Sequence, residues 1–164
     1  QYERASRVLK EPIKNPKKVY QDTAYESALN EDVTDVVYLI GDAGDPSANL
    51  MNFISHQVKA DQKNSRVKAF FLGDNIYPKG ILPEEHSGYK KSVEALLKQI
   101  ETVKEVNNGV HFVPGNHDWD ESGQDGLNAV LRQQKILNEK LGESSFLPKN
   151  GCFGPEFVII NDTT

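Results

Sequence analysis

The sequence predicts an α/β fold with a mostly parallel sheet flanked by helices. Two observations support this prediction. Apolar runs of strand length alternate with amphipathic stretches of helical length, and three of the apolar runs end in a short block that combines Gly with Asp or Asn. Such an alternation favours parallel strands joined by right-handed crossovers. With 164 residues, the chain has the length of one domain with a core of its own.

The strands are expected where the apolar runs lie, at residues 36–40, 67–72, 110–114 and 157–160. Helices are expected between them, and Pro46 marks the first turn of the first helix. Apolar residues at helical spacing indicate the side of each helix that packs on the sheet. These residues are Leu50, Phe53, Ile54 and Val58 in the first helix, Val93, Leu96, Leu97, Ile100 and Val103 in the second, and Leu127, Val130, Leu131, Leu137 and Leu141 in the third.

Residues 1–32 differ from the rest because they are polar, rich in Lys and without a clear period. We expect an extended polar arm here, so that the folded domain comprises residues 33–164. The chain begins with Gln1 rather than Met, an observation that fits a processed protein exported to the periplasm or the cell exterior. The single Cys152 allows no internal disulfide.

The composition argues against two classes of partner. The net charge of −5 disfavours binding to nucleic acid or to an anionic membrane surface, since both usually require a basic face. No apolar stretch approaches the roughly 20 residues of a membrane-spanning helix. An acidic chain can still bind phosphate where bound cations reverse the local charge.

Three short blocks at strand ends carry the chemistry: Gly41–Gly44, Gly73–Tyr77 and Gly115–Asp118. Open α/β sheets bind their ligands in the crevice beyond the carboxyl ends of the strands. Glycine before each polar residue permits the sharp turn that points a side chain into that crevice. The blocks therefore deliver several polar side chains to one place.

Their side chains suit a metal site. Asp42 and Asp74 are hard anionic ligands, and Asn116 offers a weaker, neutral carbonyl oxygen. One Asp that bridges two cations about 3.5–4 Å apart would form a two-metal clamp for phosphoryl transfer. His117 beside Asp118 suggests an imidazole that is oriented by a carboxylate and can donate a proton to a leaving oxygen.

These blocks, in this order, resemble the calcineurin-like metallophosphoesterases, whose fold is an α/β/β/α sandwich. Their details resemble the purple acid phosphatase branch, and the run Gly73–Tyr77 is most similar to its small, tartrate-resistant type. The general family has His two positions after the first Asp, where this chain has Gly44. Tyr77, three residues after Asp74, stands where purple acid phosphatases have their iron-binding tyrosinate.

The resemblance implies a role for each residue. Asp42 and Tyr77 would bind the first metal, Asp74 would bridge both metals, and Asn116 would bind the second. His117, assisted by Asp118, would act on the substrate or its leaving group. The implied metals are Fe(III) with Fe, Zn or Mn, and the implied reaction is attack of a metal-bound hydroxide on a small phosphate monoester.

The chain departs from the family in one respect. The family completes its site with three further histidines, whereas this sequence has no His after His117. We therefore expect the N-terminal half of a metallophosphoesterase domain, with weak metal binding and little or no turnover unless another segment or chain supplies the missing ligands. A half-built sheet would also favour self-association through its unpaired edge.

Two other functions stay open: a phosphodiesterase or nucleotide hydrolase that uses Mn or Zn, and a binding scaffold of the same fold without catalysis. Single residues also have simpler interpretations. Asp42 and Asp74 could cap helices, and Asn116 could occupy a left-handed turn. Tyr77 could pack under its loop, and His117 could be a structural histidine.

Overall fold

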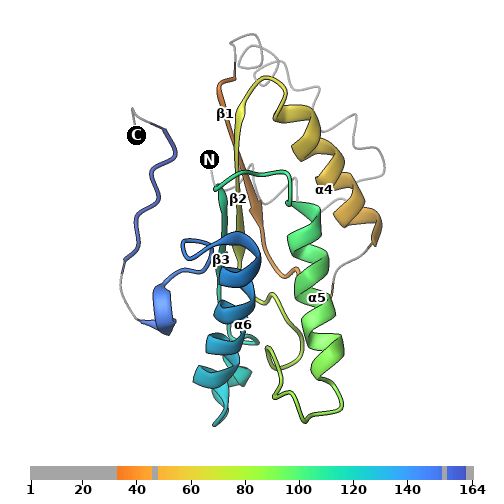
Figure 1. The fold of residues 1–164 in the computed structure, drawn as a ribbon, viewed down its shortest axis with the longest axis vertical. Helices are drawn as coiled ribbons and strands as arrows, with labels where there is room; N and C mark the ends of the chain where they lie inside the picture. Colours follow the sequence, from red (N-terminus) through yellow and green to blue (C-terminus); the bar gives the residue numbers. More distant parts are fainter. Residues whose placement is uncertain (1–32, 46–47, 153–154, 162–164) are drawn as a thin grey trace, which may run out of the picture. The chain divides into compact units, whose positions relative to one another are not determined.

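The computed structural model describes residues 33–45, 48–152 and 155–161. The expected arm at residues 1–32 and the expected helix start at Pro46 lie outside these ranges, so both stay predictions. Figure 1 shows the order of the elements. They are β1 (Asp35–Ile40), α4 (Ala48–Asp61), β2 (Arg66–Leu72), α5 (Tyr89–Thr102), β3 (Val110–Val113) and α6 (Gly126–Leu141), with short 3-10 turns at Asp120–Ser122 and Lys149–Gly151.

The three strands form a parallel sheet in which β2 lies between β1 and β3. Ile40 pairs with Phe71, and Phe71 pairs with Phe112. Parallel strands point the same way, so all three carboxyl ends lie at one edge of the sheet, which we call the carboxyl edge. The predicted α/β class with a parallel sheet is confirmed, and these strands begin and end within a residue of their predicted bounds.

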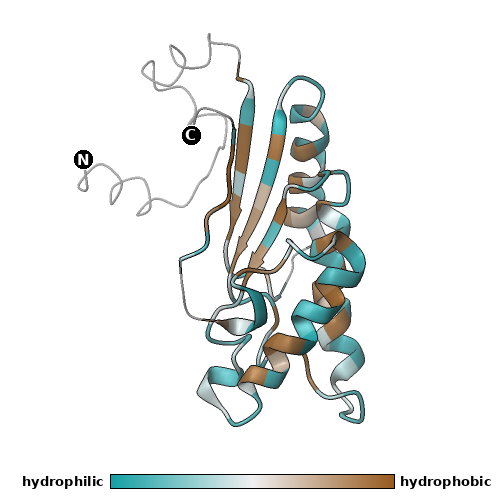
Figure 2. Cartoon of the chain, turned by 60° about the vertical axis from the view of Figure 1, so that its left-hand side comes forward, coloured by the Kyte–Doolittle hydropathy of each residue, from teal (hydrophilic) through white to brown (hydrophobic). Residues whose placement is uncertain are grey.

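The hydrophobic core lies between the sheet and the helices, and Figure 2 shows α4 and α5 on one side of the sheet. Successive strand residues point to opposite faces, so Val67, Ala69 and Phe71 of β2 are buried on the helix side. Phe71 stacks on Phe112 of β3 with ring centroids 4.2 Å apart. One core cluster includes side chains of all three helices: Met51, Ile54 and Val58 of α4, Leu96 and Ile100 of α5, and Val130 and Leu137 of α6.

The opposite side of the sheet, which we call the outer face, carries Val37, Leu39, Phe70 and Leu72. The part of this face near the carboxyl edge is apolar and partly open to solvent, whereas Lys68 and Arg66 of β2 lie toward its other end. Leu39 is 67% exposed and Leu72 is 51% exposed. Phe70 is half-buried and stacks on His111 of β3.

Residues 155–161 run along this side of the sheet in extended form (Figure 2). Val158 is half-buried and lines a hollow of about 400 Å³ together with Phe70 and Val113. Its neighbours Phe157 and Ile159 point away and are 90% and 71% exposed. The segment therefore adds apolar surface to the outer face.

The predicted fourth strand at residues 157–160 is wrong, because this segment is not paired in the sheet. Another segment already occupies the free edge of β3. The Phe112 amide donates to the Ser145 carbonyl (2.7 Å), the Leu147 amide donates to the Phe112 carbonyl (2.9 Å), and Phe146 forms the bridge to Phe112. A strand cannot pair where these backbone groups are already used.

The predicted helix faces are correct in part. On α4 the buried positions are Met51, Ile54 and Val58, whereas Leu50 and Phe53 are 52% and 60% exposed. The buried side is thus turned by about one residue from the predicted one. Leu97, Leu127 and Leu131 were also expected inside and are exposed.

A search of the described helices for a membrane span found none of sufficient length and apolar character.

Candidate metal centre

The first two blocks approach each other through backbone contacts at the carboxyl edge. The Asp42 amide donates to the Gly73 carbonyl (3.2 Å), and the Gly44 amide donates to the Asp74 carbonyl (2.8 Å). Both Asp residues have left-handed backbone, with φ of 54° at Asp42 and 52° at Asp74. Asp tolerates this conformation better than most residues. Neither caps a helix, since both lie well before the helices that follow, which begin at Ala48 and Tyr89.

Three oxygen atoms from these blocks converge. The Tyr77 hydroxyl donates to Asp42 Oδ1 at 3.0 Å and lies 3.4 Å from Asp74 Oδ2. Desolvation first, and then the carboxylates of Asp42 and Asp74, together raise the pKa of Tyr77 to about 12. Without a cation, the phenol is therefore a hydrogen-bond donor that separates two negative charges.

Gly44 leaves the space that the Tyr77 ring occupies. A Cβ atom at residue 44 would lie 2.7 Å from Tyr77 Cδ2 and 2.7 Å from the Asp74 carbonyl oxygen. Both distances are shorter than real Cβ contacts. Any side chain at position 44 would therefore collide with the loop that carries Asp74 and Tyr77.

The third block contacts the second through Asp74. The His117 amide donates to Asp74 Oδ1 at 3.2 Å, so the two oxygens of this carboxylate face different partners. A Cβ atom at Gly115 would lie 2.3 Å from Asp74 Oδ1. Glycine at position 115 is thus required for Asp74 to lie against the third block.

One nitrogen of the His117 ring is held by a hydrogen bond. Nδ1 lies 2.7 Å from the Pro78 carbonyl oxygen, to which it donates, and 3.5 Å from Glu121 Oε1. The hydrogen bond to Pro78 raises the pKa of His117, and the nearby carboxylates, Asp74 first, act in the same direction. The ring also meets the Tyr77 ring edge-on, with centroids 4.6 Å apart. Among the described residues, none hydrogen-bonds to Nε2.

The expected orientation of His117 by Asp118 is wrong. Asp118 is fully buried, and its carboxylate accepts hydrogen bonds from the backbone amides of Asn75 (3.0 Å), Ile76 (3.1 Å) and Gly115 (2.8 Å). Burial raises the pKa of Asp118 to about 6, although these amide hydrogen bonds act against the shift. Consecutive residues at a tight turn point in different directions, so neighbours in the sequence need not share a contact.

Asn116 is exposed at the carboxyl edge. It is not among the residues with positive φ, so the left-handed-turn interpretation of this residue is wrong. Its side chain makes no hydrogen bond within the described part of the chain. It is free to bind a ligand from solvent.

A comparison with protein-family models identifies residues 36–163 as calcineurin-like phosphoesterase. The match includes all three blocks and most of the chain. This chain belongs to the calcineurin-like phosphoesterases. Searches of curated proteins and of solved structures found no match.

Calcineurin-like phosphoesterases are typically hydrolases that bind two metal ions, and the residues of this chain fit part of such a site. Asp42, Asp74 and Tyr77 bring three hard oxygen atoms together, which suits one cation. In residues 33–45, 48–152 and 155–161, however, no three His, Cys, Asp or Glu side chains gather closely enough to hold a metal.

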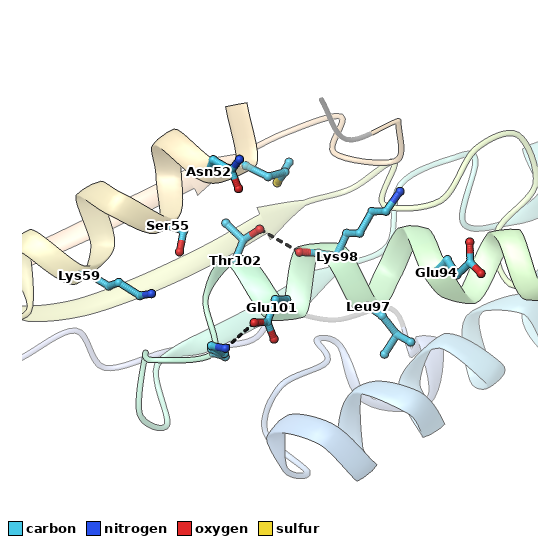
Figure 3. A pocket seen from close by; sticks show the side chains of 10 residues that line it. Asn52, Ser55, Lys59, Glu94, Leu97, Lys98, Glu101 and Thr102 are labelled. Atoms are coloured by element: carbon cyan, nitrogen blue, oxygen red, sulfur yellow. Dashed lines mark hydrogen bonds and ion pairs between the residues drawn. The ribbon is translucent and has the colours of Figure 1, made fainter. Parts of the chain in front are cut away.

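A sizeable groove lies elsewhere on this phosphoesterase domain. It measures about 650 Å³ and runs between α4 and α5 (Figure 3). Lys59, Lys98, Glu94 and Glu101 line it, so both charge signs are present and neither anionic nor cationic ligands are favoured. None of the predicted site residues line this groove. The oxygen atoms of Asp42, Asp74 and Tyr77 converge at the carboxyl edge instead.

Sequence reasoning missed two buried amides that contact the site loops, Asn75 and Gln99. Gln99 Nε2 donates to the Asn75 carbonyl oxygen at 2.6 Å. The sequence did contain an indication for Gln99. Its spacing from Leu96, Ile100 and Val103 places it on the side of the helix that faces the core. A glutamine there predicts a buried polar contact.

Proposed function

We propose that the carboxyl edge of this domain is a phosphatase site of the purple acid phosphatase type, which hydrolyses small phosphate monoesters. In this proposal Asp42 and Tyr77 would hold one cation, Asn116 would hold the second, and Asp74 would be shared by both. When bound, paired cations (Fe(III) with Fe, Zn or Mn) would supply the positive charge that neutralises the phosphate and would lower the pKa of a water molecule. His117 acts on the leaving group.

The observation that carries the proposal is the exchange of Gly44 and Tyr77. The phenol oxygen lies 3.0 Å from Asp42 Oδ1, and the Tyr77 ring lies where a side chain at position 44 would have to start. A histidine ligand at position 44 is therefore sterically replaced by the tyrosine. A phenol among carboxylates is the kind of hard donor that Fe(III) favours.

His117 suits proton donation to a leaving oxygen. Its Nδ1 is engaged with the Pro78 carbonyl, so proton exchange is left to Nε2. The raised pKa of His117 increases the fraction of imidazolium near neutral pH. A general acid here would contribute roughly 10²–10⁴-fold to the rate.

Metal binding tests the site directly. Titration of the chain with Mn²⁺, followed by electron paramagnetic resonance, should show that Asp74→Asn raises the Kd at least about tenfold, because an oxygen ligand loses its charge. Glu84→Gln is the matched control, since Glu84 is an exposed carboxylate of the loop between β2 and α5. Equal affinities for the wild type and Asp74→Asn would contradict the proposal.

Iron tests the assignment to this branch. The Fe(III)-loaded chain should show a visible phenolate charge-transfer band that Tyr77→Phe removes. If Tyr77→Phe leaves the spectrum and the activity unchanged, the site is of the Mn- or Zn-dependent kind. Rates on an aryl phosphate monoester and on the matching diester then separate a monoesterase from a phosphodiesterase.

One observation favours a second candidate, a binding scaffold without catalysis. The described residues do not gather the His, Cys, Asp or Glu side chains of a full metal site. We therefore expect slow turnover from these 164 residues alone. A chain that binds phosphate esters but does not hydrolyse them, even with metal and added imidazole, would support the scaffold.

A further inference from the structure

We propose that Gln99 of α5 is a positioning residue that acts through Asn75 and Asp118 on the loops that carry Asp74 and Asn116. This inference rests on the proposed function, because it concerns how the metal-binding side chains are held. Gln99 itself lies behind the site and does not touch the cluster of oxygen atoms.

Asp118 links the two loops. Its carboxylate accepts hydrogen bonds from Gly115, in its own loop, and from the amides of Asn75 and Ile76, in the loop after β2. The Asn75 side chain adds a fourth hydrogen bond, from Nδ2 to Asp118 Oδ2 at 3.2 Å. One buried carboxylate thus connects residues that directly follow Asp74 with the residue that directly precedes Asn116.

Asn75 and Gln99 extend this connection to α5. Asn75 Nδ2 also donates to the Val113 carbonyl at the end of β3 (2.8 Å), and Gln99 Nε2 donates to the Asn75 carbonyl (2.6 Å). Asn75, Gln99 and Asp118 are all fully buried. Water therefore cannot easily replace any of these hydrogen bonds, so the position of the loops depends on them.

The loops have little tolerance for displacement. A Cβ atom at Gly73 would lie 2.9 Å from Gly115 Cα, so the two backbones are already in close contact. Asp74, next to Gly73, has left-handed backbone and contacts the His117 amide. A shift at Asn75 would therefore be passed to the Asp74 carboxylate.

The network is not optimised for stability. Gln99 Oε1 and Asn75 Oδ1 are buried without a hydrogen-bond partner in the described part of the chain. An apolar side chain at position 99 would avoid one of these unpaired acceptors. A buried polar group that carries this cost is expected where it specifies the position of its neighbours.

The chain offers a matched control. Gln133 of α6 is as fully buried as Gln99, and neither of its side-chain amide atoms has a hydrogen-bond partner among the described residues. Gln99→Met and Gln133→Met remove the same chemical group from similar environments. Only the first removes a contact with a site loop. Gln99→Leu provides a second variant should methionine not be accommodated at position 99.

Two measurements on the full chain test the inference. Mn²⁺ titration should give a Kd about tenfold higher for Gln99→Met, in line with residues that orient ligands, and an unchanged Kd for Gln133→Met. Amide hydrogen exchange without metal should be faster at Ile76 and Gly115 in Gln99→Met only. Thermal unfolding of both variants shows whether they are folded to the same extent.

The outcomes distinguish this inference from the proposed function. Unchanged exchange at Ile76 and Gly115 in Gln99→Met, or equal effects of both variants on Mn²⁺ affinity, would overturn the positioning role. Failure of the wild type to bind Mn²⁺ would overturn the metal site. If the wild type does not bind Mn²⁺ but amide exchange is faster in Gln99→Met and unchanged in Gln133→Met, the link between α5 and the loops is still supported.

Discussion

At the scale of single residues, Gly44 is a position tightly constrained by the site. The space beyond its Cα is filled by Tyr77 and by the Asp74 carbonyl, each 2.7 Å from an added Cβ. We expect Gly44→Ala to lower the free energy of unfolding by about 1–3 kcal/mol, because crowding of a packed site is relieved only by backbone movement. Urea denaturation measures this loss.

Gly41 provides the control for this experiment. It belongs to the same block, but an added Cβ would have nothing within 4 Å. Gly41→Ala should change the unfolding free energy by no more than about 0.5 kcal/mol. Equal destabilisation by both substitutions would mean that helix or strand propensity, rather than crowding by Tyr77, determines the effect.

His111 should make stability depend on pH. Its Nδ1 donates to the Ser144 carbonyl at 2.9 Å, Nε2 is buried without a partner in the described region, and burial lowers the pKa of the ring. Below the ordinary pKa of about 6.5 the unfolded chain binds more protons at this residue, so the unfolding free energy falls as the pH drops. Burial raises the pKa of Asp118 to about 6. Between its ordinary pKa and about 6, this residue therefore makes the unfolding free energy rise as the pH drops, which is opposite to the effect of His111.

The difference between wild type and His111→Gln isolates this contribution. In His111→Gln the loss of stability from pH 6.5 downward should be smaller than in the wild type, as measured by urea denaturation at several pH values. His56, exposed on α4, is the control position. A wild-type profile that His56→Gln changes as much as His111→Gln does would contradict the assignment to His111.

From the sequence, the side chains of the candidate site were predicted more accurately than the groups to which they hydrogen-bond. Asp42, Asp74 and Tyr77 were predicted to share a ligand, and their oxygen atoms do converge. The role of Asp118 was not predictable from its place beside His117, because a side chain's direction at a turn depends on backbone angles that a motif does not state. Two of its hydrogen-bond partners are backbone amides of the loop after β2, and only tertiary packing brings that loop to Asp118.

At the scale of elements, strand positions were predictable because each strand is a short apolar run bounded by turn residues. The buried sides of the helices were less predictable. The α4 sequence has apolar residues on more than one side, and only packing decides that Met51 rather than Phe53 is buried. The prediction of the fourth strand was wrong for a related reason. The sequence does not specify which segment pairs with the edge of β3.

Two phenylalanines test the occupation of that edge. Phe146 bridges to Phe112 and is fully buried, whereas Phe157 is 90% exposed. Phe146→Ala should lower the unfolding free energy by about 3–5 kcal/mol, and Phe157→Ala by at most about 0.5 kcal/mol. Were residues 157–160 the true neighbour of β3, the larger loss would be found with Phe157→Ala.

At the scale of the whole molecule, the outer face is the feature that most affects behaviour in solution. It exposes Leu39 and Leu72, and the segment 155–161, which contains the exposed Phe157 and Ile159, runs along the same side of the sheet. Contiguous apolar surface of this kind promotes association. We expect the chain to self-associate with rising concentration in sedimentation velocity experiments.

Leu39→Glu should weaken this association, because it places a charge on the exposed apolar part of the outer face. Leu50→Glu on α4 is the matched control, since Leu50 is 52% exposed and lies away from the outer face. Both variants change the net charge equally, so general repulsion cannot explain a difference between them. Equal weakening by both would show that the outer face is not the contact surface.

The left-handed backbone at Asp42 and Asp74 has a consequence for protein engineering. If Asp42 and Asp74 bind metal as proposed, replacing them with other ligand types to alter metal preference would first cost conformational energy of the backbone. Longer or branched residues at these two sites would carry a penalty of about 1–2 kcal/mol each for positive φ. Directed evolution of this domain should therefore retain short Asp or Asn at both sites and accumulate its selectivity changes at neighbouring positions.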